Sequence, residues 1–305
     1  MAVFTIPSIK QIEREKEEIF SKMTFEAIST DYSLLLGGMR GYYYKPGRNT
    51  TGYYWINDED IKNPKGYYCE DDAHSEEIIE KSSYDIGCRP ITKYSQIKDQ
   101  CYDEMEFEFY DAPNPEKIIK VTCGEYPQFV VDDKMWGKLE NELENKKLMP
   151  TGKKYIIYTK KEIMLNNTSG DGYEREELVE YTYGGKKYVR FVGLESVNSV
   201  EKLSNGEDVE AGEVYWLEVE PVEWFVDKKD DIAICKSVLF AGVQYTSSSD
   251  VNVYGNYNFK TSTLKTYLDN YFTNEISIRD SKNIGANKIK LMKKIIHQIE
   301  SIHIN

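Results

Sequence analysis

Carboxylates are the most numerous side chains in this sequence that could carry out chemistry. The chain has 52 aspartates and glutamates, and dense acidic clusters occur at 58–60, at 70–72 and around Asp227, Asp230 and Asp231. A glycoside hydrolase uses two such carboxylates on either side of a substrate cleft. No spacing selects one pair, so the clusters favour a solvated acidic surface. A hydrolase with paired carboxylates is an alternative interpretation.

Nucleophilic and metal chemistry have less support in the residues. A nucleophilic serine or cysteine needs a base beside it, and the chain has only three histidines, of which His297 and His303 lie near its end. There is no GxSxG, phosphate-loop or GxGxxG pattern. The five cysteines include no CxxC pair, which disfavours a zinc ribbon or a redox motif. We therefore expect no catalytic residue, no metal and no cofactor, and a protein that is not an enzyme.

Aromatic residues offer a different kind of site. The chain has 25 tyrosines, and several of them lie in the first hundred residues beside the acidic cluster at 70–72. Tyrosine suits both half-buried sheets and binding surfaces, and aromatic anchors with an acidic rim suit a basic protein partner. The candidate partner-binding residues are Tyr42, Tyr43, Tyr44, Tyr53, Tyr54, Trp55, Tyr67, Tyr68, Glu70, Asp71 and Asp72.

The formal net charge of −13 bears on the class of partner. It argues against direct binding of nucleic acid, which needs a basic footprint. It is compatible with simple solubility and with docking on a basic protein surface, including one that normally holds nucleic acid. No apolar run is long enough to cross a bilayer, and the first residues lack a signal-peptide pattern. We expect a cytoplasmic protein without a membrane partner.

Periodicity and capping residues predict the elements that position these side chains. A helix is expected over 8–23, capped by Ser8 with a glutamine three positions later. The run 31–38 predicts a short apolar strand that ends at a glycine pair, and 41–58 predicts two aromatic strands around a Pro-Gly turn. The polar stretch 58–83 predicts a surface insertion.

A connector and a domain boundary are expected at 101–120, where an alternating Glu-Phe strand is followed by two prolines. A strand and a helix capped by Asp132 or Asp133 should come next. The inward face of that helix should carry Met135, Trp136, Leu139 and Leu143. Gly184-Gly185 predicts a tight hairpin turn, and Ser204 to Glu207 predicts another turn.

The last part of the chain combines strands with two amphipathic helices. Pro221 should mark an edge, bulge or bend in the strand 213–226. Thr261 or Ser262 should cap the following helix. Its apolar stripe is Leu264, Tyr267, Leu268, Tyr271 and Phe272. The lysine-rich tail 281–303 should form a helix that docks on the acidic body. A homo-oligomer contact and an external partner are alternatives for this tail.

Several segments carry a family resemblance. VEPVEWFVD, ICKSVLFAGVQY and NFKTSTLKTYLDNYF, together with DYSLLLGG, RNTTGYYWI and IGCRPITKYSQI, resemble an uncharacterised domain family from Firmicutes, Mollicutes and their phages. That family is similar in part to C-type-lectin-like domains with a Gly-x-Arg-Pro motif, here Gly87 to Pro90. The order of the two halves is reversed in this chain. Two incomplete copies and two permuted halves packed as one unit are both compatible with that order.

The resemblance implies an α+β, C-type-lectin-like fold of mixed short strands with flanking helices, plus a C-terminal amphipathic helix. It implies structural roles for Arg89, tied to a carboxylate or a backbone carbonyl, and for Pro90, and a core position for Trp224. The run Trp55 to Asp58 resembles the calcium cluster of sugar-binding C-type lectins. The companion Glu-Pro-Asn or Gln-Pro-Asp triplet is absent, so no calcium is expected.

The expected organisation has four parts: a lectin-like segment with a leading helix (1–100), the connector (101–120), a strand-rich domain around Trp224 (121–276) and a basic C-terminal helix (277–305). The expected function is that of a non-enzymatic protein-binding module of a bacterium, phage or mobile element. A sharper form is an acidic inhibitor of a host nucleic-acid-targeting defence protein. A lectin-like protein that binds carbohydrate or another small ligand is the alternative from a second class.

Overall fold

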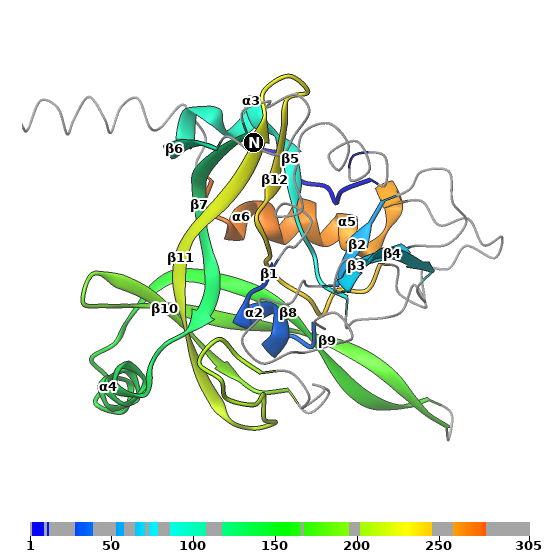
Figure 1. The fold of residues 1–305 in the computed structure, drawn as a ribbon. Coiled ribbons are helices and arrows are strands. Elements are labelled where there is room, and N and C mark those ends of the chain that lie inside the picture. Colours follow the sequence, from blue (N-terminus) through cyan, green and yellow to red (C-terminus); the bar gives the residue numbers. More distant parts are fainter. Residues whose placement is uncertain are drawn as a thin grey trace, which may run out of the picture.

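The computed structural model describes residues 2–8, 11, 28–38, 53–57, 65–70, 73–78, 86–107, 118–165, 168–194, 202–245 and 259–278. Over these residues the protein is α+β, and its largest element is one antiparallel sheet of eight strands (Figure 1). The strands of this sheet are β5 (Ile91–Lys93), β6 (Tyr102–Phe107), β7 (Ile118–Val130), β8 (Met149–Leu165), β9 (Thr168–Tyr183), β10 (Lys186–Val192), β11 (Val214–Asp227) and β12 (Ile232–Cys235).

Strand β11 is the centre of this sheet. On one edge it pairs first with β10 and then with β12, and on the other edge it pairs with β7. The register against β7 shifts between Pro221 and Glu223, close to the change of partner. Proline has no N–H to give to a ladder, so an irregularity here accommodates a proline in a central strand. The prediction of a bulge at Pro221 is confirmed.

The segment expected to be a connector, 101–120, belongs to the same sheet. Its described residues supply β6 and the start of β7, which pair with each other, and β5 from the preceding segment pairs with β12. One sheet therefore takes strands from both sides of the expected boundary, and one hydrophobic core contains both Phe4 and Ile276. Alternating residues indicate a strand, but they do not reveal its partner.

Two smaller sheets lie beside the large one. Strands β2 (Tyr54–Ile56), β3 (Lys65–Glu70) and β4 (Ala73–Ile78) form an antiparallel sheet, and β1 (Ile28–Ser29) pairs in parallel with β13 (Ser237–Val238). The stretch 58–83, expected to be a surface insertion, contains the paired strands β3 and β4. Although the stretch that contains β3 is polar in composition, β3 forms a strand because it pairs with the aromatic strand β2.

Residues 31–35 form the short helix α2 (Asp31–Leu35), so the expected strand is wrong. The side chain of Thr30 accepts a hydrogen bond from the Ser33 N–H at 3.2 Å and caps the helix. Every residue of α2 is buried. A short apolar run that is buried on all sides has no periodicity, so the sequence did not distinguish a helix from a strand here.

Helix α4 (Asp133–Glu144) begins as the sequence predicts. The Asp132 carboxylate accepts a hydrogen bond from the Met135 N–H at 2.7 Å. Leu139 is fully buried, whereas Trp136, expected to face inward, is 40% exposed. The remaining short helical elements before the C-terminal segment are α3 (Tyr94–Ile97) and the 3₁₀ turn Lys98–Gln100.

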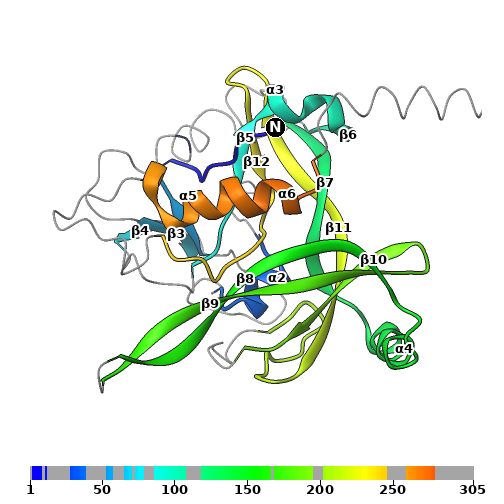
Figure 2. The ribbon, with the colours of Figure 1, turned by 180° about the vertical axis from the view of Figure 1, so that it is seen from behind.

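The helical segment near residue 270 is the one expected after Lys260. It contains the 3₁₀ turn Phe259–Thr261, α5 (Thr263–Tyr267), a π-helical turn Leu268–Phe272 and α6 (Thr273–Glu275). Ser262 is the cap, because its side chain accepts from the Lys265 N–H at 3.0 Å. Figures 1 and 2 show this segment, in orange, between the strands β7 and β11 and the small sheet β2–β4.

Two local predictions near the ends of strands and helices are confirmed. Ser8 and Gln11 form a reciprocal capping box: the Ser8 N–H donates to Gln11 Oε1 at 2.9 Å, and the Gln11 N–H donates to Ser8 Oγ at 3.2 Å. The turn between β9 and β10 consists of Gly184 and Gly185 with φ of 58° and 82°. The rest of the first predicted helix and the lysine-rich tail 281–303 lie outside the described residues.

The core confirms the positions expected of Trp224 and Arg89. Trp224 is fully buried, and its Nε1–H donates to the Cys123 carbonyl at 2.8 Å. Arg89 is 1% exposed, its Nε–H donates to the Cys235 carbonyl at 2.7 Å, and its guanidinium lies over the Tyr54 ring. No helix in the described part of the chain is long and apolar enough to span a bilayer.

Candidate functional site

Four of the aromatic residues expected to form an exposed binding face are buried instead. Tyr53 is 8% exposed, Tyr67 is 3% exposed, and Tyr54 and Trp55 are inaccessible to solvent. Backbone pairing holds β2 inside the fold, with β3 on one edge and, on the other, the Trp55 N–H donating to the Gly87 carbonyl at 3.0 Å. Other side chains then cover the rings: the Trp55 ring lies 5.5 Å from that of Tyr245, and the Tyr54 ring lies 5.6 Å from that of Tyr67. The prediction of an exposed aromatic face is wrong for these four residues.

The other candidates are not brought together by the described structure. Tyr68 and Glu70 belong to β3, and for these two residues the backbone alone is described. Tyr42, Tyr43, Tyr44, Asp71 and Asp72 lie outside the described residues. Their role in binding a partner stays a prediction.

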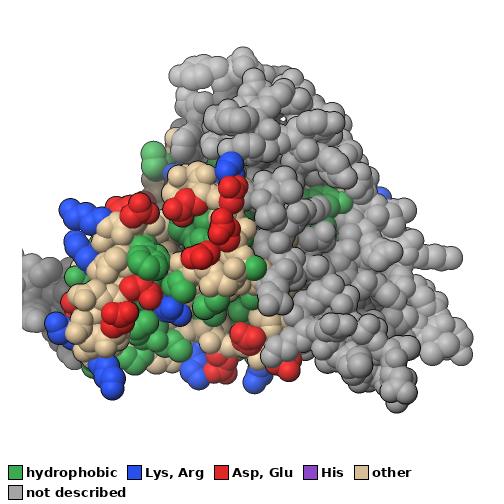
Figure 3. Space-filling view, turned by 90° about the horizontal axis from the view of Figure 1, so that it is seen from below, with side chains coloured by type: hydrophobic (Ala, Val, Ile, Leu, Met, Phe, Trp, Pro, Cys, Tyr) green, Lys and Arg blue, Asp and Glu red, His purple; other side chains and the backbone are tan. Residues whose placement is uncertain are grey.

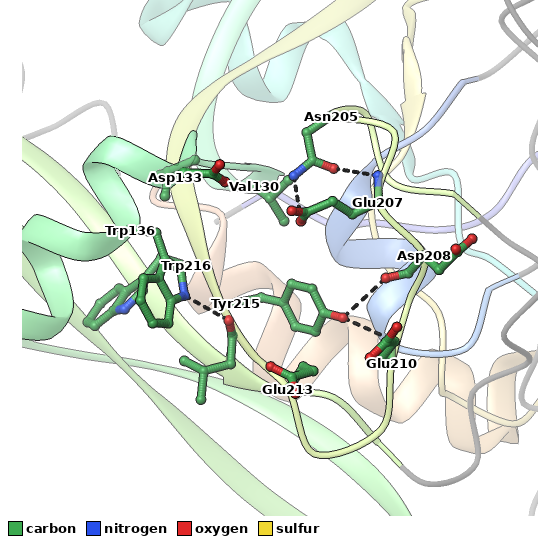
Figure 4. Close-up of a pocket in the computed structure, with 12 residues that line it drawn as sticks. Val130, Asp133, Trp136, Asn205, Glu207, Asp208, Glu210, Glu213, Tyr215 and Trp216 are labelled. Atoms are coloured by element: carbon green, nitrogen blue, oxygen red, sulfur yellow. Dashed lines mark hydrogen bonds between the residues drawn. The ribbon is translucent and has the colours of Figure 1, made fainter.

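The described structure places a pocket elsewhere, beside the N-terminal end of α4 (Figure 4). Its volume is about 380 Å³. Its wall is made by the end of β7, the start of α4, the loop that precedes β11, and the first residues of β11. The lining residues are Val130, Val131, Asp133, Trp136, Asn205, Glu207, Asp208, Glu210, Glu213, Val214, Tyr215 and Trp216. We call this the acidic pocket.

Five carboxylates and three aromatic rings give the acidic pocket its character, and its lining, among the described residues, contains no lysine, arginine or histidine. Asp208 has a cation beside it, since Lys202 Nζ lies 2.7 Å from its carboxylate. Asp133, Glu210 and Glu213 form no salt bridge among the residues the structure describes. Figure 3 shows the face of the molecule that is seen from below in the view of Figure 1. Over the described part of this face, acidic and hydrophobic side chains are interspersed.

The loop that carries most of these carboxylates is held by its own hydrogen bonds. The predicted turn at 204–207 is present, with the Leu203 N–H donating to the Glu207 carbonyl at 2.8 Å. The Asn205 side chain accepts from the Glu207 N–H at 3.0 Å and donates to the Glu207 carboxylate at 2.7 Å. Figure 4 draws the two contacts of the Asn205 side chain.

The Tyr215 side chain holds the second half of this loop, around Asp208 and Glu210, by hydrogen bonds to its backbone. Its hydroxyl accepts a hydrogen bond from the Glu210 N–H at 2.8 Å and donates to the Asp208 carbonyl at 3.3 Å. Figure 4 shows the Tyr215 ring in the middle of the pocket, with its hydroxyl toward these two residues. Because the Tyr215 hydroxyl bonds only the backbone of the loop, it leaves the carboxylate of Glu210 available at the rim, whereas that of Asp208 pairs with Lys202.

Trp136 and Trp216 form the opposite side of the acidic pocket. The Trp136 Nε1–H donates to the Val214 carbonyl at 2.8 Å, and the Trp216 Nε1–H donates to Glu140 Oε1 at 2.6 Å. Arg190 also donates to Glu140, from Nε at 2.9 Å. Partial burial raises the pKa of Glu140, but the hydrogen bonds from Arg190 and Trp216 outweigh it, so the net pKa lies below its ordinary value.

Replacing Glu140 with alanine should destabilise the protein by roughly 2 kcal/mol, because the buried Trp216 N–H and Arg190 lose their shared acceptor. The free energy of unfolding from urea titration measures this loss. A pKa below the unfolded value means that the contribution of Glu140 is present at neutral pH and disappears as the pH falls through the folded pKa. Glu144→Ala, at the exposed end of the same helix, is the control, and an equal loss there would contradict the assignment.

The acidic pocket can bind a cation and should repel an anion. Carboxylates around a concave site attract ammonium and guanidinium groups, and aromatic rings add cation–π attraction. The same charges oppose phosphate groups. Among the described residues, no group of three or more His, Cys, Asp and Glu side chains is arranged to hold a metal ion.

Sequence reasoning missed this site, although one signal for it exists. Residues 207–213 contain four acidic side chains in seven positions, between a predicted turn and a predicted strand. Trp136 was expected to be buried, and nothing in the sequence brings it beside that acidic loop. Comparison with protein-family models, with curated proteins and with solved structures finds no match to this chain.

Proposed function

We propose that the protein is a binding module without catalytic activity, which docks on a basic protein surface and takes a lysine or arginine side chain of that surface into the acidic pocket. The observation that carries this proposal is the combination of five carboxylates and three aromatic rings around one cavity without a basic lining residue. The net charge of −13 supports the same class of partner over long range.

Size and burial support a side chain as the occupant. Ligand pockets typically have volumes of about 300–1,000 Å³, and 380 Å³ lies at the lower end of that range. A guanidinium group has five donors in a plane, which suits several carboxylates around a flat aromatic wall. The occupant would therefore be held by charge at the rim and by its apolar stem against Trp136 and Tyr215.

The partner in the sharper form of this proposal is a nucleic-acid-targeting defence protein in a bacterial cytoplasm, whose basic channel the acidic surface would occupy. The C-type-lectin-like arrangement is part of the same proposal. Its support is that the Gly87–Pro90 segment and the Trp224 strand meet through one sheet, with β5 paired to β12 and Arg89 bonded to the Cys235 carbonyl. This contact favours permuted halves packed as one unit over two separate copies.

A peptide titration tests the pocket directly. The probe is an acetylated and amidated nonapeptide of alternating glycine and arginine, and the matched probe replaces each arginine with citrulline, which has the same shape without the charge. We expect the arginine peptide to bind at least about tenfold more tightly, a difference of about 1.4 kcal/mol. The affinity should fall as salt is added, because the attraction is electrostatic. The tryptophan fluorescence of the protein, to which Trp136 and Trp216 of the lining contribute, reports occupancy.

The double variant Glu210→Gln with Glu213→Gln should weaken the arginine peptide at least about fivefold, a loss of about 1 kcal/mol. Its charge-matched control is Glu144→Gln with Glu177→Gln, which lies outside the acidic pocket and should leave the affinity unchanged. Equal binding of the two peptides, or equal effects of the two double variants, would overturn the proposal. A captured nucleic-acid-handling partner that is lost with the pocket variant alone would support the sharper form.

The concave shape of the pocket also favours a second candidate, a protein that binds a small ligand. Such a ligand would carry an ammonium or guanidinium group, because a neutral glycan gains nothing from the carboxylates. Free arginine amide distinguishes the two in the same titration. Binding as tight as that of the peptide favours the small ligand, and much weaker binding favours a protein surface.

A further inference from the structure

We infer that Asp31 is a positioning residue of the acidic pocket, because its carboxylate is bonded both to the end of β7 and to the loop that precedes β11. The inference rests on the proposed function for its consequence in binding, whereas its structural part stands independently. Asp31 is the first residue of α2, far from the pocket residues in the sequence, and it is not part of the pocket lining.

The contacts of Asp31 are specific to a carboxylate. Oδ1 accepts the Ser204 N–H at 2.7 Å. Oδ2 accepts the Val130 N–H at 3.0 Å and also the Ser204 hydroxyl. All three partners are donors, so both oxygens must act as acceptors. The side chain is inaccessible to solvent, so water cannot replace these bonds.

The two bonded backbone segments belong to adjoining parts of the wall of the acidic pocket, the end of β7 and the loop that precedes β11. Val130 is a lining residue at the end of β7, next to the start of α4. Ser204 immediately precedes Asn205, which begins the lining part of the loop. The far half of that loop is held by Tyr215, as described above, and Asp31 holds the near half. Together they fix the distance between the carboxylate-bearing loop and the aromatic wall.

Asp31→Asn changes the hydrogen bonding with almost no change of shape. An asparagine has one acceptor oxygen and one amide group that can only donate. In either orientation its NH₂ faces a backbone N–H, that of Ser204 or that of Val130. That N–H then loses its acceptor, and the segment that carries it loses its bond to residue 31. The near half of the loop should then open locally while the rest of the sheet stays folded.

Hydrogen exchange of the ligand-free protein tests the structural part. We expect the amides of 203–207 to exchange at least tenfold faster in Asp31→Asn, with the amides of β11 and those of β7 before Val130 unchanged. Ser204→Ala, which loses only the hydroxyl bond, should show a smaller acceleration in the same place. This second variant decides the question if Asp31→Asn fails to fold. Unchanged exchange at 203–207 in the folded variants would overturn the inference.

The chain supplies a matched control. Ser95 and Asp231 repeat the Ser204–Asp31 geometry at the start of α3, with the Ser95 N–H and hydroxyl both 2.6 Å from the Asp231 carboxylate. Asp231→Asn should loosen residues near 95 and leave 203–207 unchanged.

The arginine nonapeptide then tests the functional part. We expect its dissociation constant to rise at least fivefold in Asp31→Asn and to stay the same in Asp231→Asn. If the wild-type protein does not bind the peptide, the proposed function fails while the exchange data still decide the role of Asp31. If exchange rises at 203–207 but the affinity is unchanged, Asp31 holds the loop without positioning the binding site, and the inference is overturned in that part.

Discussion

Glu275→Gln is expected to make the stability of the protein much less dependent on pH between 5.5 and 7.5. Glu275 is 3% exposed at the end of α6. Its Oε1 accepts the Ile156 N–H at 2.7 Å, and its Oε2 accepts the hydroxyls of Tyr126 at 3.1 Å and Tyr267 at 3.3 Å. Burial raises its pKa to about 7, because these hydrogen bonds compensate only part of the lost hydration.

The sign follows from proton linkage. The folded state holds a proton on Glu275 up to about pH 7, whereas the unfolded state loses it near the ordinary value of 4.5. The folded state therefore binds more protons in this window, and the stability of the wild type falls as the pH rises. A shift from 4.5 to about 7 corresponds to a total of roughly 3 kcal/mol, of which about 2 kcal/mol falls between pH 5.5 and 7.5.

Glutamine resembles the protonated acid, so it should remove this slope. The difference in unfolding free energy between Glu275→Gln and wild type should grow by about 2 kcal/mol from pH 5.5 to 7.5, in favour of the variant. Urea titrations at four or five pH values measure it. The window lies below the pKa of Lys153, which desolvation lowers to about 8, so this neighbouring lysine stays charged.

An exposed glutamate provides the control for this experiment. Glu177 on β9 pairs with Lys154 at the surface, and Glu177→Gln should leave the pH dependence as it is in the wild type. A Glu275→Gln protein with the same slope as the wild type would show that this carboxyl is already ionised, and hydrated, across the window.

Trp224→Ala should cost about 3–5 kcal/mol, which is a large part of the stability of a typical domain. Trp224 lies in β11 between Val121 of β7 and Cys235 of β12, and its ring is 6.0 Å from that of Phe4. Truncation leaves a cavity where three segments of the chain meet. It also removes the indole N–H that bonds the Cys123 carbonyl.

Thermal and urea unfolding of Trp224→Ala and Trp224→Phe measure this loss. Phenylalanine keeps most of the apolar volume, so its cost should be smaller, about 1–3 kcal/mol. Trp136→Phe is the control, because Trp136 is 40% exposed and should cost about 1 kcal/mol or less. A loss at Trp224 no larger than that at Trp136 would contradict its place at the centre of the core.

Features that depend on a few neighbouring residues were predictable from the sequence. Asp132 and Ser262 cap their helices, and Gly184-Gly185 makes its hairpin turn, because each of these bonds or dihedral angles is decided within four or five residues. The stripe Leu264, Tyr267, Leu268 and Phe272 is buried for a similar reason, since helical periodicity alone brings it to one face.

Features that depend on which distant segments meet were decided by the tertiary structure. Tyr54 and Trp55 were expected at a surface, but the Tyr54 ring packs against Tyr67 and Arg89, and the Trp55 ring packs against Tyr245. Residues 31–35 are buried on every side, so their sequence has no periodic pattern, and only the tertiary structure shows that they are helical.

The acidic pocket is the clearest case of this second kind. Acidic residues 207–213 can be read from the sequence, but the sequence does not show that Trp136 lies across from them or that Asp31 is bonded both to the end of β7 and to the loop that precedes β11. Those contacts join positions roughly 70 to 170 residues apart in the chain. Composition and local pattern therefore determined the charge, the turns and the caps, whereas the site itself arises from long-range pairing that no local pattern encodes.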